Sequence, residues 1–305
     1  MNALVLSGGG AKGAYQVGVL KRWMGEQGRD YDAICGISVG AINGAYLAQF
    51  SKGNPKAAAD ALEKLWNRVD NSNVKRSWFP FGVLGSILKP SVYDSRPLQD
   101  WIKRELRTDQ VARSGRQLRV VAVSWNSGEA KVADQSTSDL ASWVIASSAF
   151  PVMLTPINIG GQLWTDGGLR SVTPLGEAIR LGATEIDVIM CSNPFAADPF
   201  DALGKAAIPA LALRAVDILT DQIMRADLEI CGLKNDLARA GGPHRHVKLR
   251  LLQPSRPLTS DSLDFDPSNL REMMRIGYAD ADAQLGAVSF GEVREFTKGA
   301  PASRA

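Results

Sequence analysis

Histidine and cysteine are scarce in this sequence of 305 residues, which contains two histidines and three cysteines. An odd number of cysteines without metal-ligand spacing argues for free thiols in a reducing compartment rather than for a disulfide framework. The first residues also lack the basic start and the long apolar stretch of a secretory signal peptide. From these absences we expect a cytoplasmic protein.

A large excess of charge of one sign is missing as well. The 35 basic and 32 acidic residues leave a formal net charge of +3, so the total charge gives no reason to expect nucleic acid or another polyanion as a partner. A hydrophobic content of 45% and a charged content of 22% are those of an ordinary globular protein. Since no repeat or linker divides the chain, we expect one domain over residues 1–296 and a disordered tail over residues 297–305.

Strand-like and helix-like segments alternate from the start of the chain. Residues 3–6 and 33–35 are short apolar runs typical of buried strands, and each is followed by residues that favour a helix. This alternation predicts an α/β fold of three layers, in which a mainly parallel central sheet lies between helices. Thr173 is expected to cap a helix over residues 174–182. Further strands are expected at residues 118–125, 130–133, 157–159, 162–165, 186–190 and 246–252, and further helices at residues 55–69, 139–148, 202–240 and 270–285.

A serine lies at the junction between the second strand and its helix. Residues 36–40, Gly-Ile-Ser-Val-Gly, match the pattern G-x-S-x-G. A strand that runs into a helix through one serine forces a sharp turn, and Gly36 and Gly40 remove the side chains that would collide across it. The hydroxyl of Ser38 is then exposed above the sheet, at the positive end of the helix dipole. The stretch therefore predicts a nucleophile elbow with Ser38 as the nucleophile.

The same stretch allows another interpretation. Residues 33–51 carry no charge, and glycines recur at four-residue spacing, as in a membrane-spanning helix with a dimerisation face. Polar residues within the run and the number of glycines argue against a span of about 20 predominantly apolar residues. A buried helix with small residues on its surface is compatible with the elbow.

A second glycine-rich stretch follows the first strand and begins a helix. Residues 8–13 match the dinucleotide-binding pattern G-x-G-x-x-G, but the acidic residues Asp30 and Asp32 precede the second strand instead of ending it. A phosphate loop would need serine or threonine after Lys12. Backbone N–H groups of such a loop stabilise an oxyanion if the loop lies beside the elbow. We therefore expect this stretch to form an oxyanion hole, from Gly8, Gly9, Gly10, Ala11, Lys12 and Gly13. The alternative is a nucleotide-binding or regulatory module that uses the same loop.

A serine nucleophile also needs a base, and the chain offers two kinds. His244 and His246 follow Asp166, which reproduces the Ser…Asp…His order of α/β-hydrolases, but they lie in a polar turn. Asp166 could instead act directly, because Asp-Gly-Gly at the end of a strand places a carboxylate on a tight turn. A carboxylate base loses activity only as acid protonates it, although burial raises that pKa, whereas an imidazole titrates near about 6.5.

The segment over residues 75–119 departs from this pattern. It contains ten basic and four acidic residues, a local charge of +6 that exceeds the total of +3. Its first part, residues 75–90, combines Lys75 and Arg76 with aromatic side chains, among them Trp78, Phe79 and Phe81. This composition is compatible with a peripheral membrane contact, with a lid over a cleft, or with an ordinary solvated basic face.

The three motifs together resemble those of patatin-like phospholipases. The resemblance covers about residues 3–190 and rests on the glycine loop, on the serine elbow, on Asp166-Gly167-Gly168, and on Ser148-Ala149-Phe150-Pro151 before the aspartate. One departure is Lys12, where the family more often has arginine with its fork of donors.

The resemblance implies a patatin-like fold, a Ser38–Asp166 catalytic dyad without histidine, and an oxyanion hole from the first glycine loop. It also implies hydrolysis of lipid acyl esters without a metal or another cofactor, as a phospholipase A, lysophospholipase or carboxylesterase. The expected partner is then a lipid or acyl-ester substrate. The nearest alternative is an acyltransferase that uses the same acyl-serine intermediate.

Overall fold

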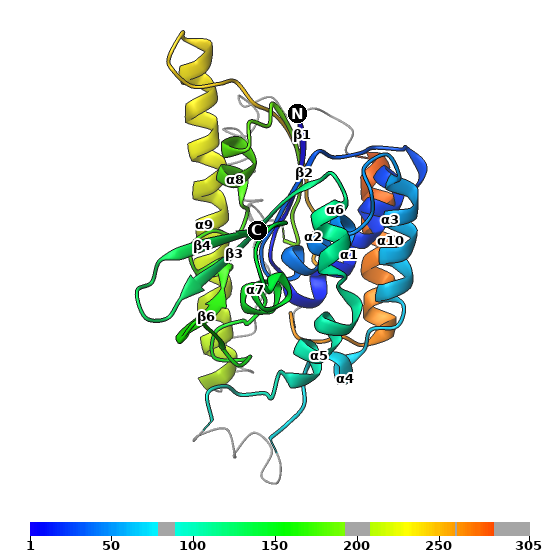
Figure 1. Ribbon diagram of the computed structural model, residues 1–305, viewed down its shortest axis with the longest axis vertical. Coiled ribbons are helices and arrows are strands. Elements are labelled where there is room, and N and C mark those ends of the chain that lie inside the picture. The colour runs from blue at the N-terminus through cyan, green and yellow to red at the C-terminus, as the bar shows by residue number, and fades with distance from the viewer. Residues whose placement is uncertain (79–88, 193–207, 260, 284–305) are drawn as a thin grey trace, which may run out of the picture.

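Strand β1 (Asn2–Leu6) lies inside a mainly parallel sheet, as the computed structural model shows (Figure 1). The structure describes residues 1–78, 89–192, 208–259 and 261–283, so the predicted tail over residues 297–305 lies outside them. The strand order is β5-β6-β3-β2-β1-β7-β8, with β4 also paired to β3. The other strands are β2 (Ala33–Gly36), β3 (Gln117–Ser124), β4 (Ala130–Asp134), β5 (Ile157–Ile159), β6 (Gln162–Asp166), β7 (Glu185–Ile189) and β8 (Lys248–Leu252).

Helices cover both faces of this sheet. Because side chains alternate along a strand, Leu4 and Leu6 of β1 point to one face, while Ala3 and Val5 point to the other. Two helices, α8 (Leu175–Arg180) and α9 (Ile208–Arg239), cover the Ala3 face. The Leu4 face is covered chiefly by α1 (Gly13–Leu20), α2 (Val39–Ala48), α3 (Pro55–Trp66) and α10 (Pro267–Ala283).

The predicted fold class is therefore confirmed: the protein is a three-layer α/β/α structure. The strands β1, β2, β3, β7 and β8 are parallel, whereas β4 and β6 run antiparallel to β3, and β5 runs antiparallel to β6. The remaining helical segments are η1 (Gly10–Lys12), η2 (Lys21–Glu26), α4 (Asn71–Val74), α5 (Arg96–Glu105), α6 (Thr108–Arg113), α7 (Leu140–Ser147) and η4 (Gly167–Leu169).

Two sequence-based interpretations are wrong. The uncharged run over residues 33–51 is not a single span, because it divides into the buried strand β2 and the separate helix α2. In the part of the chain that the structure describes, no helix is both long enough and apolar enough to cross a membrane. Thr173 does not cap α8: Pro174 occupies the N-cap position, and the buried Thr173 hydroxyl has no hydrogen-bond partner among the described residues.

Candidate active site

The backbone turns sharply at Ser38, between β2 and α2. Ser38 has φ 56° and ψ −129°, in the left-handed region that a residue with a side chain rarely adopts. A Cβ on Gly36 would lie 2.1 Å from the carbonyl oxygen of Gly40, and one on Gly40 would lie 2.3 Å from that of Leu6. The turn therefore needs glycine on both sides of the serine, as the pattern G-x-S-x-G predicts.

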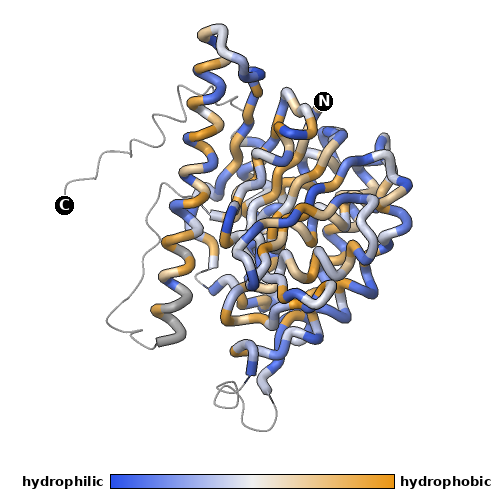
Figure 2. Tube along the Cα trace, turned by 60° about the vertical axis from the view of Figure 1, so that its left-hand side comes forward, coloured by the Kyte–Doolittle hydropathy of each residue, from blue (hydrophilic) through white to orange (hydrophobic). Residues whose placement is uncertain are grey.

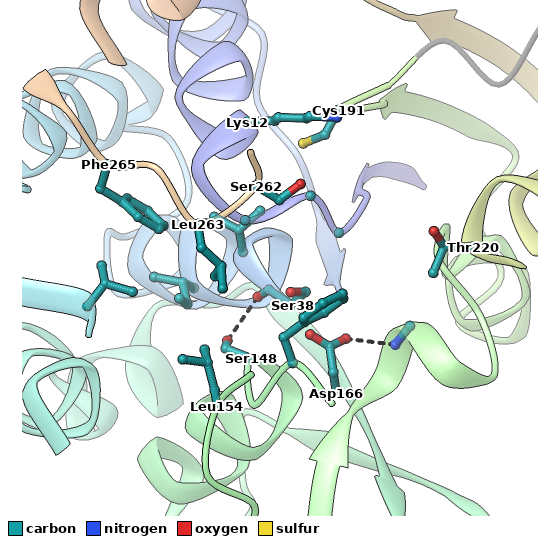
Figure 3. Close-up of a pocket in the computed structure, with 18 of the residues that line it drawn as sticks. Lys12, Ser38, Ser148, Leu154, Asp166, Cys191, Thr220, Ser262, Leu263 and Phe265 are labelled. Atoms are coloured by element: carbon teal, nitrogen blue, oxygen red, sulfur yellow. Dashed lines mark hydrogen bonds between the residues drawn. The ribbon is translucent and has the colours of Figure 1, made fainter. Parts of the chain in front are cut away.

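Asp166 lies beside Ser38 because β2 and β6 share one edge of β3. Gly36, the last residue of β2, pairs with Val120, and Asp166, the last residue of β6, pairs with Ala122. Strand β4 occupies the opposite edge of β3 at both positions, so β2 and β6 must lie on the same edge. Since β6 runs antiparallel to β3, the carboxyl ends of β2 and β6 meet, which brings the serine just after β2 close to the aspartate that ends β6 (Figure 3).

The carboxyl group of Asp166 is buried and only half satisfied. The side chain is 2% exposed, and its Oδ1 accepts a hydrogen bond of 2.8 Å from the Gly168 N–H. Its Oδ2 has no hydrogen-bond partner of normal geometry among the described residues. Burial raises the pKa of Asp166 to about 7, although the nearby Ser38 hydroxyl and the Gly168 N–H act in the opposite direction. Ser38 and Asp166 thus face each other in a loose contact of the kind that often tightens only when substrate is bound.

The first glycine loop borders the elbow. A Cβ on Gly8 would lie 3.2 Å from Ser38 Cβ, so the loop and the serine are in direct contact. Gly10 has φ 57°, and a Cβ there would lie 2.0 Å from the carbonyl oxygen of Ser262. The glycines therefore allow the loop to fit between the serine and the segment that precedes α10.

The N–H groups of this loop divide into two sets. Those of Gly8, Ala11, Lys12 and Gly13 already donate to backbone carbonyls, for example Ala11 to Ser262 at 2.8 Å. Among the described residues, the N–H groups of Gly9 and Gly10 donate no hydrogen bond, and both residues line the cavity above Ser38. Of the six N–H groups in the stretch that the sequence suggests, only those of Gly9 and Gly10 are thus left to donate to an oxyanion, among the described residues.

Two serines at the end of α7 hold the elbow in place. The Ser38 N–H donates to Ser147 Oγ at 3.1 Å. Ser148 Oγ donates to the Ser38 carbonyl oxygen at 3.1 Å (Figure 3). Sequence reasoning did not identify Ser147, and it noted Ser148 only through the family resemblance. Because these contacts join residues more than 100 positions apart, no local sequence pattern predicts them.

A buried chain of hydrogen bonds links the glycine loop to the cavity wall. Gln16 Nε2 on α1 donates to the Ser7 carbonyl oxygen at 2.9 Å, and its Oε1 accepts from Asn43 Nδ2 at 2.9 Å. Asn43 Nδ2 also donates to the Gly13 carbonyl oxygen at 3.2 Å, and Asn43 Oδ1 accepts from Trp66 Nε1 at 2.7 Å. These polar groups are buried and paired, so they fix both ends of the loop relative to α2 and α3.

The two histidines lie far from this site. His244 and His246 are exposed and precede β8, whose first residue is level with the first residues of β7 and β1. Ser38 follows the last residue of β2, which is level with the end of β1. Four residue steps of parallel strand, about 13 Å, separate these two edges of the sheet. The Ser…Asp…His arrangement that the chain order allowed is therefore not assembled.

The cavity above Ser38 has an apolar side and a polar side. Its polar side contains Lys12, Ser192, Arg214, Thr220 and Asp221, which come from the glycine loop, the segment after β7 and helix α9. Figure 3 shows Leu154, Leu263 and Phe265 gathered on the other side of Ser38. The apolar lining consists of Val39, Ile42, Trp66, Val69, Val74, Leu98, Trp101, Phe150, Leu154, Val172, Leu263 and Phe265.

Only part of the basic segment over residues 75–90 belongs to the described residues. Phe79 and Phe81 lie outside them. Lys75 donates to the Leu263 carbonyl oxygen and is half-buried, and Arg76 forms an ion pair of 2.6 Å with Asp94. Both cations are thus engaged in contacts within the fold.

Comparisons with known proteins give a family match and distant relatives. The family model described as "Patatin-like phospholipase" matches residues 4–179. Two curated relatives, both named "Lysophospholipase NTE1", come from Yarrowia lipolytica and Debaryomyces hansenii. They are 23% and 24% identical over 189 residues, which cover 60% of this chain but only 12% and 11% of theirs. A structure titled "Crystal structure of VipD from Legionella pneumophila" aligns at 14% identity with a TM-score of 0.41, over 93% of this chain and 67% of that one, a likeness too distant to support an argument.

Proposed function

Since the chain belongs to the patatin-like phospholipase family, we propose that it hydrolyses acyl esters of lipids, with Ser38 as the nucleophile and Asp166 as the base. The observation that carries this proposal is the buried Asp166 carboxyl group, whose Oδ2 is unpartnered among the described residues and faces the serine. A buried carboxyl group without a cation is costly for the fold, so it points to a chemical role.

The first half of the reaction transfers the acyl group to the enzyme. Ser38 Oγ attacks the ester carbonyl carbon while Asp166 Oδ2 accepts the hydroxyl proton. A pKa of about 7 leaves a substantial fraction of Asp166 ionised at neutral pH and still makes it a stronger base than an exposed aspartate. When the tetrahedral intermediate collapses, Asp166 returns the proton to the departing alcohol oxygen. The product is an acyl ester on Ser38.

The second half releases the fatty acid. A water molecule attacks the acyl carbon, and Asp166 takes a proton from that water as the new bond forms. Collapse of the second intermediate breaks the bond to Ser38 Oγ, which recovers its proton from Asp166. The same carboxyl group thus acts as base and then as acid in each half.

Two backbone donors are available for the developing oxyanion. The N–H groups of Gly9 and Gly10 are uncommitted among the described residues and lie at the start of the helical segment that leads into α1. The positive end of that segment favours negative charge at this point. Each such donor contributes on the order of 100- to 1000-fold in rate. The hydrogen bonds from Gln16 and Asn43 keep these donors in place.

The division of the cavity supports a substrate with one acyl chain. We propose that the chain lies against the side formed by Trp66, Trp101 and Phe265, while the alcohol part of the ester faces Lys12 and Arg214. The names of the two curated relatives point in the same direction, toward lysophospholipids. This substrate class is proposed on those grounds.

A peripheral membrane contact through residues 75–90 is proposed in a narrower form. Lys75 and Arg76 are used within the fold, and Trp78 Nε1 donates to the Ser91 carbonyl oxygen at 2.9 Å. The described groups left for a lipid surface are the ring of Trp78 and the Lys89 ammonium, which lies 5.4 Å from the centroid of that ring. A tryptophan beside a cation suits the boundary between lipid head groups and acyl chains. A Trp78→Ser variant should then lose more activity on vesicles than on a short soluble ester, and equal losses would contradict the contact.

A substrate panel tests the proposed function. Fatty acid release is measured from lysophospholipids, phospholipids, monoacylglycerols and a short soluble ester, with Ser38→Ala as the control. We expect release that depends on Ser38, fastest with single-chain lipids. Adding an alcohol acceptor distinguishes an acyltransferase, because the acyl group would then leave on the acceptor in preference to water. No turnover of any ester by the folded wild-type protein would contradict the proposal.

A further inference from the structure

Helix α9 carries apolar side chains on its outer face as well as on the face that packs against the sheet. Six of its large side chains are 43% to 63% exposed, and they make up half of the twelve exposed large hydrophobic residues of the described chain. The helix spans 32 residues at the edge of the molecule (Figure 2). Four of the six, Leu219, Ile230, Leu233 and Leu237, lie on the side of the helix opposite the buried Met224, Leu228 and Cys231. A row of exposed apolar side chains commonly marks an interaction site.

The outer face has a regular spacing. The residues of this face follow one another at intervals of four, three, four, four, three and four positions, which keeps them on one side of a straight helix. They are Ala215, Leu219, Gln222, Ala226, Ile230, Leu233 and Leu237. The series reads the same in both directions from its middle residue, Ala226. A surface with this symmetry is complementary to a copy of itself that runs in the opposite direction, as a two-fold dimer requires.

We propose that the outer face of α9 binds the same face of a second copy of this chain, in an antiparallel helix pair with its two-fold axis at Ala226. The larger residues then meet across the axis: Leu219 faces Leu233 of the second copy, and Gln222 faces Ile230 of the second copy. Ala226 faces Ala226 of the second copy, where two small side chains let the helices approach closely. At each end of this row of residues, the seam, the small side chain of Ala215 lies against the large side chain of Leu237 of the second copy.

Charge favours this partner over a lipid surface. Arg225 and Glu229 flank the seam on the same side, and the two-fold axis places Arg225 of one copy next to Glu229 of the other, twice in the dimer. The sequence of α9 contains four basic and five acidic residues, so it lacks the cationic excess of helices that lie on anionic membranes.

The size of the seam sets the expected affinity. From Ala215 to Leu237 it is about 33 Å long and about 10 Å wide, or about 330 Å² in each copy. A standard interface buries about 800 Å² per partner, so this contact is small. We therefore expect a weak dimer that forms at high micromolar protein concentration and dissociates on dilution.

Sedimentation velocity and cysteine cross-linking test the dimer. Wild-type protein should shift from monomer to dimer between about 1 and 100 μM. Leu219→Glu and Leu233→Glu should each weaken association at least tenfold, because either change places two charges in the seam. The matched control is Leu163→Glu, at a leucine of β6 that is 46% exposed, which should leave association unchanged.

Cross-linking fixes the position of the axis. Ala226→Cys should form a disulfide-linked dimer under mild oxidation, whereas Gln222→Cys should not, because its two copies lie about 12 Å apart along the helices. The native cysteines are buried and do not compete. Monomeric wild type at 100 μM, equal cross-linking at both positions, or vesicle binding by a monomer through these leucines would overturn the proposal.

Discussion

Two buried aspartates lie on opposite halves of the sheet, each one strand in from an edge, and have opposite surroundings. Asp187 on β7 is 1% exposed, and its carboxylate accepts from the Tyr31 hydroxyl at 2.8 Å and from Arg250 Nη2 at 2.9 Å, with Arg29 at 3.3 Å. Asp166 is 2% exposed and is bonded by one backbone N–H, with no cation among its described contacts. The two carboxyl groups are therefore buried to the same extent, but only that of Asp187 is paired with cations.

The difference shows what each group is for. A buried carboxylate that is fully paired contributes to the fold, whereas an unpaired one is kept only where a reaction needs a base or an acid. Asp187 joins β7 to β8 and to the segment before β2 through its cations. Asp166 leaves one oxygen directed toward Ser38.

Activity should separate the two aspartates most strongly. Asp166→Asn should lower the turnover of a soluble ester by roughly 100- to 10,000-fold, because an amide cannot accept the serine proton. Asp187→Asn should stay within a few-fold of wild type per folded molecule. Circular dichroism is measured alongside, so that loss of fold is not mistaken for loss of chemistry. A large loss in the Asp187 variant alone would reverse the comparison.

Stability should change in the opposite sense for Asp166. Its pKa is raised in the folded state, so the folded protein is penalised as pH rises from the unfolded value of about 4 through about 7. Asp166→Asn should therefore be more stable to urea at pH 8, by up to about 4 kcal/mol for a shift of about three units. The gain should disappear near pH 4, where both side chains are neutral. A variant that is destabilised at pH 8 would contradict the unpaired carboxylate.

Asp187→Asn should instead destabilise the protein. Removing the charge leaves Arg250 and Arg29 beside a neutral amide, and both guanidinium groups are only partly exposed. We expect a loss of about 2–3 kcal/mol in urea unfolding at pH 8, less than for a fully buried pair because solvent reaches the arginines. Unchanged stability would show that the ion pairs do not contribute to the fold.

The pH dependence of kcat/KM is a smaller effect that tests the ionisation of Asp166. Because Asp166 must be ionised to act as a base, kcat/KM should be constant above about pH 7 and fall about tenfold per unit below it. The Asp187→Asn variant should keep the same limb. An imidazole titrates near about 6.5, so this limb alone does not distinguish the two bases, and the variants are needed. A profile that is flat down to pH 5 would contradict a pKa of about 7.

Most of the fold was predictable because its signals are local. The strand before residue 38, the serine with its glycines, and the hairpin before Asp166 are each contained within a short stretch of consecutive residues. The position of a glycine loop between the first strand and a helix was also predictable from the sequence. The division of its donors was not, because it depends on distant carbonyls such as that of Ser262.

The supports of the site could not be predicted for the same reason. Gln16 and Asn43 are ordinary helix residues in sequence, and only packing brings them together with the ring nitrogen of Trp66. The pairing of β6 with the edge of β3 beyond β2 is likewise a property of the whole sheet. The helix over residues 202–240 was predicted from its sequence, but its apolar outer face was not, because only the packing against the sheet shows which side of α9 is left exposed.

Labelling of Ser38 by a fluorophosphonate tests the central claim most directly, because it needs no knowledge of the substrate. Peptide mapping gives the rate of modification at Ser38 in wild type, in Asp166→Asn, and in a variant with both His244→Ala and His246→Ala. The account predicts rapid labelling in wild type, a similar rate in the histidine variant, and a rate at least about 100-fold lower in Asp166→Asn. Slow labelling in the folded histidine variant with a normal rate in Asp166→Asn would contradict a serine activated by Asp166.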